Sequence, residues 1–350
     1  MPDDATPMPT LAERIGPIGP PATPTHPEVA DWRPVAKDDV EELLGFHADV
    51  ARADHPHWTE SRDELEAVFD LPHVDPRRDS MIGFDRSGRI VAHGSAVVPT
   101  GRETLVRSVV LGAVRPDARG RGIGRALLGW QVARAREQLA ATGARLPGWI
   151  ISFIEDGVTD AAALLAHAGF RVARQFSSLE RDLAAPVAEV PAAPGVRLET
   201  WSPAWSEAAR LARNASFAEH WGSQSVDRVT WESMVSGRDF APDLGVVAIA
   251  ADESGTERVV GLVAATRNSG DWPGQGFTST YVRLVGVVPD ERGRGIAQAL
   301  LARHLAEASA AGLERSVLDV DAENPSGALA LYARAGYVVA HGHASHVLVV

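Results

Sequence analysis

A short stretch that occurs twice constrains this chain more than any other feature. The run VRPDARGRGIGRALL at 114–128 returns as VVPDERGRGIAQALL at 287–301, and Gly295 stands 173 positions after Gly122. That separation is the length of one small domain, and 350 residues leave room for two domains. The sequence therefore predicts a duplicated unit. We expect each copy to be a mixed α/β sheet of about six or seven largely antiparallel strands, flanked by about four helices.

Each copy of the repeat has the residue pattern of a strand, a glycine-rich loop and a helix. In the second copy, the apolar run 284–288 ends at Pro289, and apolar residues recur at helical spacing from Ile296 onward. The glycines between them let the backbone N–H groups turn toward one point, and the helix N-terminus adds about half a positive charge. We therefore predict an anion site at this loop and a phosphate-bearing ligand.

The details of the loop narrow the kind of phosphate ligand. Neither copy contains the Gly-Lys-Ser/Thr of a P-loop, and the glycine spacing does not fit G-x-G-x-x-G. The remaining pattern, Arg292-x-x-Gly295-x-Ala297, resembles the pyrophosphate loop of the Gcn5-related N-acetyltransferases (GNATs). The segment 316–337 resembles the fifth strand, the asparagine turn and the last helix of the same family. Both segments point to a tandem GNAT protein.

The resemblance implies that acetyl-coenzyme A is the co-substrate and that the second loop holds its pyrophosphate. It implies cofactor contacts in the second copy from Val287, Arg292, Gly293, Arg294, Gly295, Ile296, Ala297, Asn324 and Ser326. Asn324 could also cap the helix that begins near Ser326, and the two roles are compatible. The first copy keeps the corresponding loop residues, Arg119, Gly120, Arg121, Gly122 and Gly124, for which we expect the same phosphate role.

Tyr332 matches the family's tyrosine, which protonates or hydrogen-bonds the departing coenzyme A thiolate. A phenol with a pKa of about 10 can supply that proton, although a tyrosine here could also be a core aromatic of an amphipathic helix. The first copy has Leu165 at this position and lacks the asparagine turn. We therefore expect catalysis in the second copy only. The first copy is expected to bind coenzyme A without transfer, unless its loop is a relic of the duplication.

The general base is left open among four residues. An attacking amine has to be neutral, and a carboxylate or a water chain can remove its proton. Asp319 and Asp321 lie on one face of a predicted strand, because apolar residues alternate with them. Glu219 and His220 lie on the loop that covers the acceptor site in the family. Each of the four could also be an ordinary solvated or structurally bonded polar group.

Proline content suggests the domain boundaries. Residues 1–30 are rich in proline and lack a periodic apolar pattern, which predicts a disordered or loosely draped tail. Residues 31–183 form the first predicted domain, 184–195 a Pro/Ala linker, and 196–350 the second, catalytic domain.

Composition excludes several classes of protein. The chain has no cysteine, so it has neither disulfides nor a thiolate nucleophile, and its net charge of −12 argues against nucleic-acid binding. His341 and His343 lie on the opposite strand face from His346, so no metal site is predicted. The sequence shows no membrane span or signal peptide, and a cytoplasmic monomer or homodimer is expected.

These observations predict an N-acetyltransferase that moves an acetyl group to a primary amine of a small molecule by direct attack. Two alternatives remain open from the sequence. One is acetylation of protein or peptide amino groups, and the other is a non-catalytic acetyl-coenzyme A binder that regulates a partner.

Overall fold

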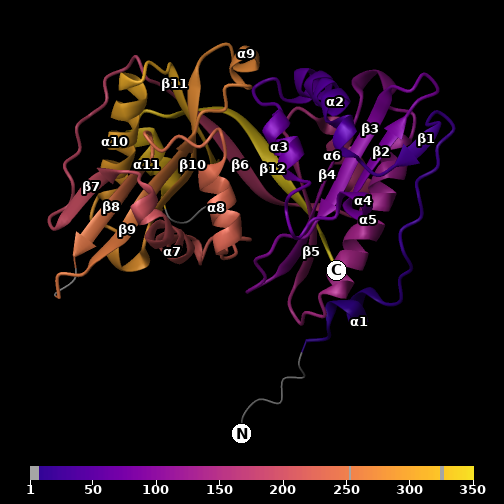
Figure 1. Ribbon diagram of the computed structural model, residues 1–350, viewed down its shortest axis with the longest axis horizontal. Helices are drawn as coiled ribbons and strands as arrows, with labels where there is room; N and C mark the ends of the chain where they lie inside the picture. Colours follow the sequence, from indigo (N-terminus) through magenta and orange to yellow (C-terminus); the bar gives the residue numbers. More distant parts are fainter. Residues whose placement is uncertain (1–7, 252–253, 324–326) are drawn as a thin grey trace, which may run out of the picture. The chain divides into compact units, whose positions relative to one another are not determined.

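The computed structural model describes residues 8–251, 254–323 and 327–350. The chain divides into two compact units, one made of residues up to 173 together with 344–350, and the other of residues 174–343 (Figure 1). The predicted fold class, two α/β domains with largely antiparallel sheets, is confirmed. Among the described residues, none of the helices combines the length and the apolarity that crossing a bilayer requires.

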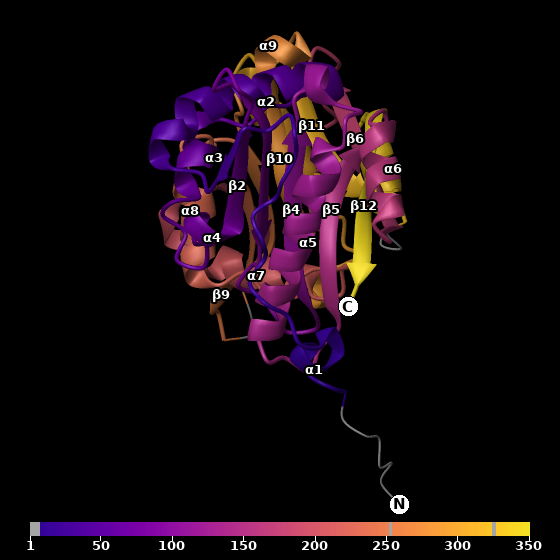
Figure 2. The same ribbon diagram turned by 90° about the vertical axis from the view of Figure 1, so that its right-hand side faces the viewer.

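The first unit contains a sheet in the order β1-β2-β3-β4-β5, antiparallel except for the parallel pair β4–β5. Its strands are β1 (Asp31–Arg33), β2 (Ser80–Phe84), β3 (Ile90–Val97), β4 (Val106–Val114) and β5 (Gly148–Glu155). Its helices are α1 (Leu11–Ile15), α2 (Val40–Asp54), α3 (Arg62–Ala67), α4 (Pro76–Asp79), α5 (Ile123–Ala141) and α6 (Thr159–His167), with 3₁₀ turns at Lys37–Asp39 and Pro116–Ala118. Helix α5 packs along β3 and β4 (Figure 2).

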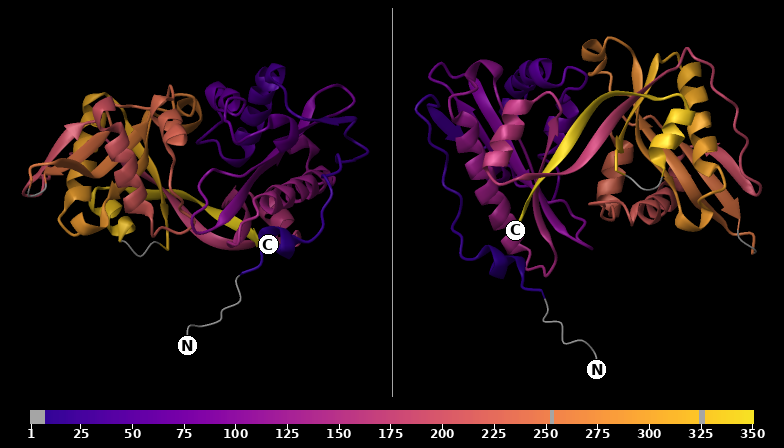
Figure 3. Two further views of the ribbon diagram at one scale, coloured as in Figure 1. Left: turned by 60° about the horizontal axis from the view of Figure 1, so that its bottom comes forward. Right: turned by 180° about the vertical axis from the view of Figure 1, so that it is seen from behind.

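The second unit repeats this plan in the order β6-β11-β10-β9-β8-β7, where β10–β11 is the parallel pair. Its strands are β7 (Val196–Thr200), β8 (Val246–Ala251), β9 (Glu257–Thr266), β10 (Ser279–Val287) and β11 (Arg315–Asp321), together with most of β6 (Arg171–Asp182) and the first half of β12 (Val338–Val349). Its helices are α7 (Ser206–Phe217), α8 (Arg228–Ser236), α9 (Trp272–Gln275), α10 (Ile296–Ala310) and α11 (Ala328–Arg334), with 3₁₀ turns at Pro203–Trp205 and Pro289–Glu291. Figure 3 shows the ribbon from two further sides, coloured by residue number.

Helices α7 and α10 cover opposite faces of the second sheet. A Cβ on Gly286 of β10 would lie 3.0 Å from the Phe217 ring of α7. A Cβ on Gly261, which pairs with the next residue of β10, would lie 3.0 Å from Leu300 of α10. Successive strand residues face opposite sides, so the two glycines give each helix its close approach.

The prediction of a disordered tail over 1–30 is wrong for its described part, residues 8–30. Thr10 and Glu13 form a capping box at the start of α1, and the Leu11 side chain is fully buried. The backbone N–H of Leu11 donates to the carbonyl of Ala144 at 2.8 Å. Burial of this leucine anchors the segment despite its prolines, which sequence composition alone does not reveal.

The domain boundaries also differ from the prediction. Residues 174–182, predicted in the first domain, belong to the second unit, and residues 344–350, predicted in the second domain, belong to the first. Residues 176–182 of β6 pair with β11, and the second unit therefore begins inside β6, at residue 174. At the chain end, the Val350 N–H donates to the Gly148 carbonyl of the first unit at 3.0 Å. Part of the predicted linker packs on the second unit, where Ala193 is buried.

Replacing Leu11 by alanine should lower the free energy of unfolding by about 3 kcal/mol, because the leucine fills a closed site. Ile18 in the same segment is 41% exposed, so Ile18→Ala should change stability by less than about 0.5 kcal/mol. Urea unfolding measures both values. Equal effects of the two substitutions would show that the segment is not anchored through Leu11.

Candidate functional site

The parallel strands β10 and β11 of the second unit stop pairing part-way along their length. Their last paired residues are Tyr281 and Val317. Beyond this point β11 stays paired with β6, and β10 stays paired with β9, with a register shift between Val282 and Leu284. Such an irregularity bends a strand and increases its twist. The two strands therefore separate after Tyr281, and among the described residues no strand pairs with the β11-facing edge of β10 beyond that point.

Strand β10 leads into the glycine loop and then into α10, which begins at Ile296 as predicted. Gly293 and Gly295 have φ angles of 78° and 79°, a conformation that favours glycine. A Cβ on either residue would meet nothing within 4 Å, so backbone conformation rather than crowding explains the glycines. The first N–H groups of α10 lack intrahelical acceptors. The loop thus has the form of the predicted anion site, and phosphate binding there stays a prediction.

The arginines of this loop are engaged with the protein. Arg292 donates to the Ser216 carbonyl at 2.9 Å and to Glu219 at 3.2 Å. Arg294 pairs with Glu291 and donates to the Pro194 carbonyl at 2.5 Å. Their contacts fasten the loop to its surroundings, so the backbone N–H groups are the donors best placed for a phosphate.

Buried Glu291 explains why Arg294 pairs with the protein although its own side chain stays exposed. The carboxylate is 8% exposed and lies in the 3₁₀ turn before the loop, where it also accepts from Arg258 at 2.5 Å. A buried carboxylate is costly without a cationic partner. The sequence pattern indicated a phosphate role for Arg294 but did not reveal that Glu291 already pairs with this arginine.

The structure places Tyr332 on α11 in the core of the second unit. Its side chain is 8% exposed, and its ring centroid lies 5.7 Å from that of Tyr337. Burial raises the pKa of Tyr332 to about 12, so the phenol carries its proton at neutral pH. Among the described residues, no hydrogen bond is recorded for its hydroxyl. Tyr332 is therefore both a core aromatic and a protonated donor.

Asp319 lies beside a tyrosine that the sequence did not single out. It accepts a hydrogen bond from the Tyr281 hydroxyl at 2.8 Å and another from the Ser178 hydroxyl. Burial raises the pKa of Tyr281 well above its ordinary value, and Asp319 and Tyr332 add to the rise. Tyr281 stands where the strands separate, and only the pairing register between β10 and β11 would have revealed it.

The other three base candidates have different surroundings. Glu219 is exposed and pairs with Arg292. Asp321 lies 4.0 Å from the guanidinium of Arg174. Burial lowers the pKa of His220, as does the nearby charge of Arg292, while Asp321 opposes this shift. His220 is therefore neutral at neutral pH and has a free proton-accepting capacity.

Two predicted cofactor residues, Asn324 and Ser326, lie outside the described residues. Val287, which was expected to contact the cofactor, ends β10 and is 9% exposed; it pairs with Gly261 of β9. Ala297 in the first turn of α10 packs on the core of the unit.

The first unit keeps the same strand separation and the same loop geometry. Pairing between β4 and β5 ends at Val109 and Ile151. Gly120 and Gly122 have φ angles of 74° and 101°. Strands β3 and β4 pair without the register shift seen in the second unit. Leu165, in the position of Tyr332, is 5% exposed and belongs to the core.

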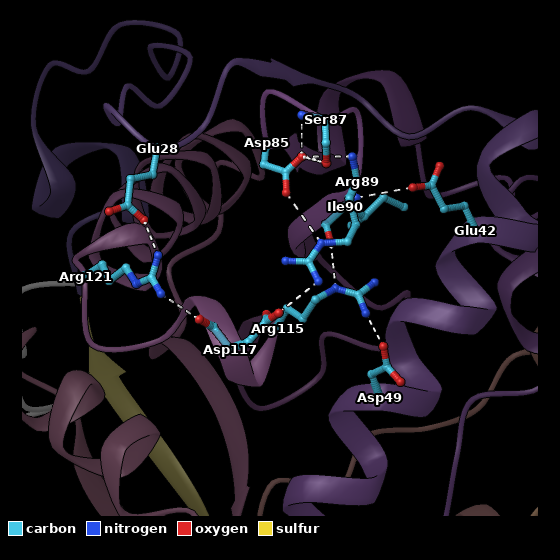
Figure 4. A network of polar contacts seen from close by, with 10 residues as sticks. All are labelled: Glu28, Glu42, Asp49, Asp85, Ser87, Arg89, Ile90, Arg115, Asp117 and Arg121. Carbon is cyan, nitrogen blue, oxygen red and sulfur yellow. Dashed lines mark hydrogen bonds and ion pairs between the residues drawn. The ribbon is translucent and has the colours of Figure 1, made fainter.

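Ion pairs also engage the arginines of the first loop. Arg119 makes a two-pronged contact with Asp54, with both distances 2.7 Å. Arg121 donates to Glu28 at 3.0 Å and to the Asp117 carbonyl (Figure 4). A Cβ on Gly124 would lie 3.2 Å from Leu164 of α6, so this glycine serves helix packing. In both loops the arginines are paired with the protein and the two glycines have positive φ angles, so the backbone N–H groups of either loop could bind an anion in the same way.

The family is shown by comparison with known proteins. Residues 41–170 and 205–337 match the acetyltransferase (GNAT) family. The chain belongs to this family, with one copy in each half, and is an acyltransferase. The family's co-substrates are acyl-coenzyme A thioesters.

Relatives and solved structures agree with the tandem arrangement. The mycothiol acetyltransferase of Mycobacterium avium (strain 104) is 30% identical over 335 residues, which cover 88% of this chain and 94% of the relative. A GCN5-related N-acetyltransferase from Sphaerobacter thermophilus has a TM-score of 0.69 at 24% identity, over 91% of this chain and 95% of the other. A tandem GNAT protein from the clavulanic acid biosynthesis pathway has a TM-score of 0.66 at 19% identity, over 91% and 98%. The chain is a tandem GNAT protein similar in architecture to mycothiol synthase.

Proposed function

We propose that the second unit transfers an acetyl group from acetyl-coenzyme A to a primary amine of a small molecule by direct attack. The observation that carries this proposal is the separation of β10 from β11 next to the glycine loop, with the protonated Tyr332 in the same core. A thioester with a phosphate-bearing arm needs three things from its enzyme. These are a strand edge that binds the arm, a loop that binds the phosphates, and a proton donor for the leaving sulfur.

Each part of the co-substrate has a matching feature in this unit. The N–H groups of the Gly293–Gly295 loop and the first turn of α10 suit the pyrophosphate. The edge of β10 after Tyr281 offers backbone donors and acceptors to the amide groups of the pantetheine arm, since such groups otherwise stay unsatisfied. With the arm bound in this way, we expect the thioester to lie beyond it, near the strand separation.

The reaction needs one base and one acid. The neutral amine attacks the acetyl carbonyl carbon, a C–N bond forms, and the C–S bond then breaks. Tyr332 gives its hydroxyl proton to the departing sulfur and recovers one from solvent. His220, kept neutral by burial, takes the proton that the amine loses. Asp319 holds the Tyr281 hydroxyl and is thereby a weaker candidate for the base.

The chemistry of the acceptor side favours a cationic amine. Asp319 and Asp321 stand on one face of β11, and Arg174, paired with Glu323 at 2.5 Å, offsets only part of the negative charge. The mycothiol acetyltransferase relatives support a small-molecule acceptor. For the first unit we propose binding of coenzyme A without transfer, because its loop is retained while Leu165 cannot donate a proton.

Release of coenzyme A from acetyl-coenzyme A tests this function, since the cysteine-free chain adds no background with a thiol reagent. The acceptors are S-methyl-L-cysteinamide, glucosamine and a lysine-containing peptide. Turnover with either small amine supports the proposal. Turnover with the peptide alone favours the protein acetyltransferase alternative. Binding of acetyl-coenzyme A without turnover of any amine would contradict transfer to these acceptors.

The lowered pKa of His220 predicts the pH profile. Because the neutral imidazole is the active form, kcat at saturating amine should fall as pH drops through a pKa below 6.5. His220→Gln should remove this acid limb and lower kcat/KM at neutral pH by about tenfold or more. Glu219→Gln, at the neighbouring exposed residue, should keep the limb. An unchanged limb in His220→Gln would assign the base elsewhere.

A further inference from the structure

Three polar side chains form a hydrogen-bonded chain inside the core of the second unit. They are His304 of α10, Ser316 of β11 and Tyr337, which follows α11; the first two are fully buried and Tyr337 is 4% exposed. His304 Nδ1 lies 2.9 Å from the Leu244 carbonyl, and its Nε2 lies 3.4 Å from Ser316 Oγ. Ser316 Oγ lies 2.7 Å from the Tyr337 hydroxyl. No step of the proposed reaction uses any of the three.

The direction of every hydrogen bond in this chain is fixed by its first member. A carbonyl only accepts, so His304 Nδ1 carries the proton and donates to Leu244. Burial lowers the pKa of His304 to about 4, so the ring is neutral and its Nε2 accepts from Ser316. Ser316 has then used its proton and accepts from Tyr337. Each hydrogen bond therefore has one possible donor and one possible acceptor, and the Tyr337 hydroxyl has one preferred position.

Tyr337 is directly connected to Tyr332. Its backbone N–H donates to the Tyr332 carbonyl at 3.0 Å, and the two rings meet edge to face at 5.7 Å. The end of α11 is also held by Arg181 of β6, whose Nε donates to the Ala335 carbonyl at 2.7 Å. These hydrogen bonds thus link α10, which directly follows the glycine loop, to the end of α11, the helix that carries Tyr332.

The first unit offers an internal comparison. Gln131 and Phe170 stand at the positions of His304 and Tyr337, and Ile150, which faces α5 as Ser316 faces α10, stands in place of the serine. Gln131 instead donates to the carbonyls of Ser95 on β3 and Leu111 on β4. The copy with a leucine in place of the proton donor therefore also lacks the polar chain.

We propose that His304, Ser316 and Tyr337 are positioning residues that hold the Tyr332 hydroxyl at a fixed place relative to the coenzyme loop. This inference rests on the proposed role of Tyr332 as the proton donor. A fully satisfied polar network in an apolar core makes one arrangement unique, whereas apolar packing alone tolerates small shifts. A displacement of about 1 Å at a catalytic group can cost up to about 10²-fold in rate.

The test compares Tyr337→Phe and Ser316→Ala in two backgrounds, the wild-type chain and Tyr332→Phe. Turnover is measured with acetyl-coenzyme A and S-methyl-L-cysteinamide, and thermal unfolding checks that each variant folds. Each substitution should lower kcat about tenfold, with the KM for acetyl-coenzyme A within about twofold of wild type. In the Tyr332→Phe background the same substitutions should change kcat by less than about twofold, because there is no hydroxyl left to position.

Ser279→Ala is the matched control. Ser279 is a buried serine at the start of β10, and its hydroxyl donates to Gln275 at 2.7 Å, away from the chain. Its removal should leave kcat within about twofold in both backgrounds.

The outcomes separate this inference from the proposed function. An equal loss from Tyr337→Phe in both backgrounds, or no loss in the wild type, would overturn the positioning role alone. Full activity of Tyr332→Phe by itself would overturn the proton-donor role and, with it, the need for positioning.

Discussion

Tyr332→Phe should lower kcat by about 10²-fold while acetyl-coenzyme A still binds with an unchanged Kd. The substitution removes only the hydroxyl, and the ring keeps its place in the core against Tyr337. Without the phenol proton, the coenzyme A thiolate has to leave unassisted. Because burial raises the pKa of Tyr332 to about 12, wild-type kcat should stay level to high pH and fall only as the phenol ionises. Steady-state kinetics and calorimetry measure the two quantities.

Tyr281→Phe is the matched control for this prediction. It removes the Tyr281 hydroxyl, which donates to Asp319, without changing any residue of α11. Its effect on kcat should be smaller, since Tyr281 is tied to a carboxylate and Tyr332 is not. Full activity of Tyr332→Phe at every pH would remove this residue from the mechanism.

The sequence predicted the parts of the site that depend on local pattern. The repeat located both glycine loops, and the start of α10 follows from apolar spacing after two glycines. The same holds for the alternation that puts Asp319 and Asp321 on one face of β11. Each of these features is determined by residues close together in the chain, so it can be predicted from one segment of the sequence.

What the sequence missed depends on residues that are distant in the chain. Tyr281 meets Asp319 only through the register of β10 and β11, and Arg294 donates to the carbonyl of Pro194, which lies far earlier in the chain. The buried position of His304 is likewise set by Leu244 and Ser316. Such pairings follow from tertiary packing, which a residue pattern in one segment does not encode.

Gly295→Val should abolish turnover and weaken acetyl-coenzyme A binding in the second unit at least about 10²-fold. Gly295 has a φ angle of 79°, which a β-branched residue adopts only under strain. Nothing in the protein lies within 4 Å of its would-be Cβ, so the valine side chain enters the space that a phosphate needs. Gly312→Val is the matched control for strain alone, because Gly312 has a φ angle of 75° and equally open surroundings at the far end of α10. This control should lose stability but keep binding.

The same variant decides what the first unit does. Its loop has the same backbone conformation at Gly122, and Arg119 and Arg121 are held in ion pairs much as Arg292 and Arg294 are. If backbone N–H groups supply the binding, calorimetry of Gly295→Val should still find one site per chain, with no turnover. Adding Gly122→Val should then remove that site. Loss of all binding in Gly295→Val alone would make the first loop a relic of the duplication, and surviving turnover would mean that the second unit is not the catalytic one.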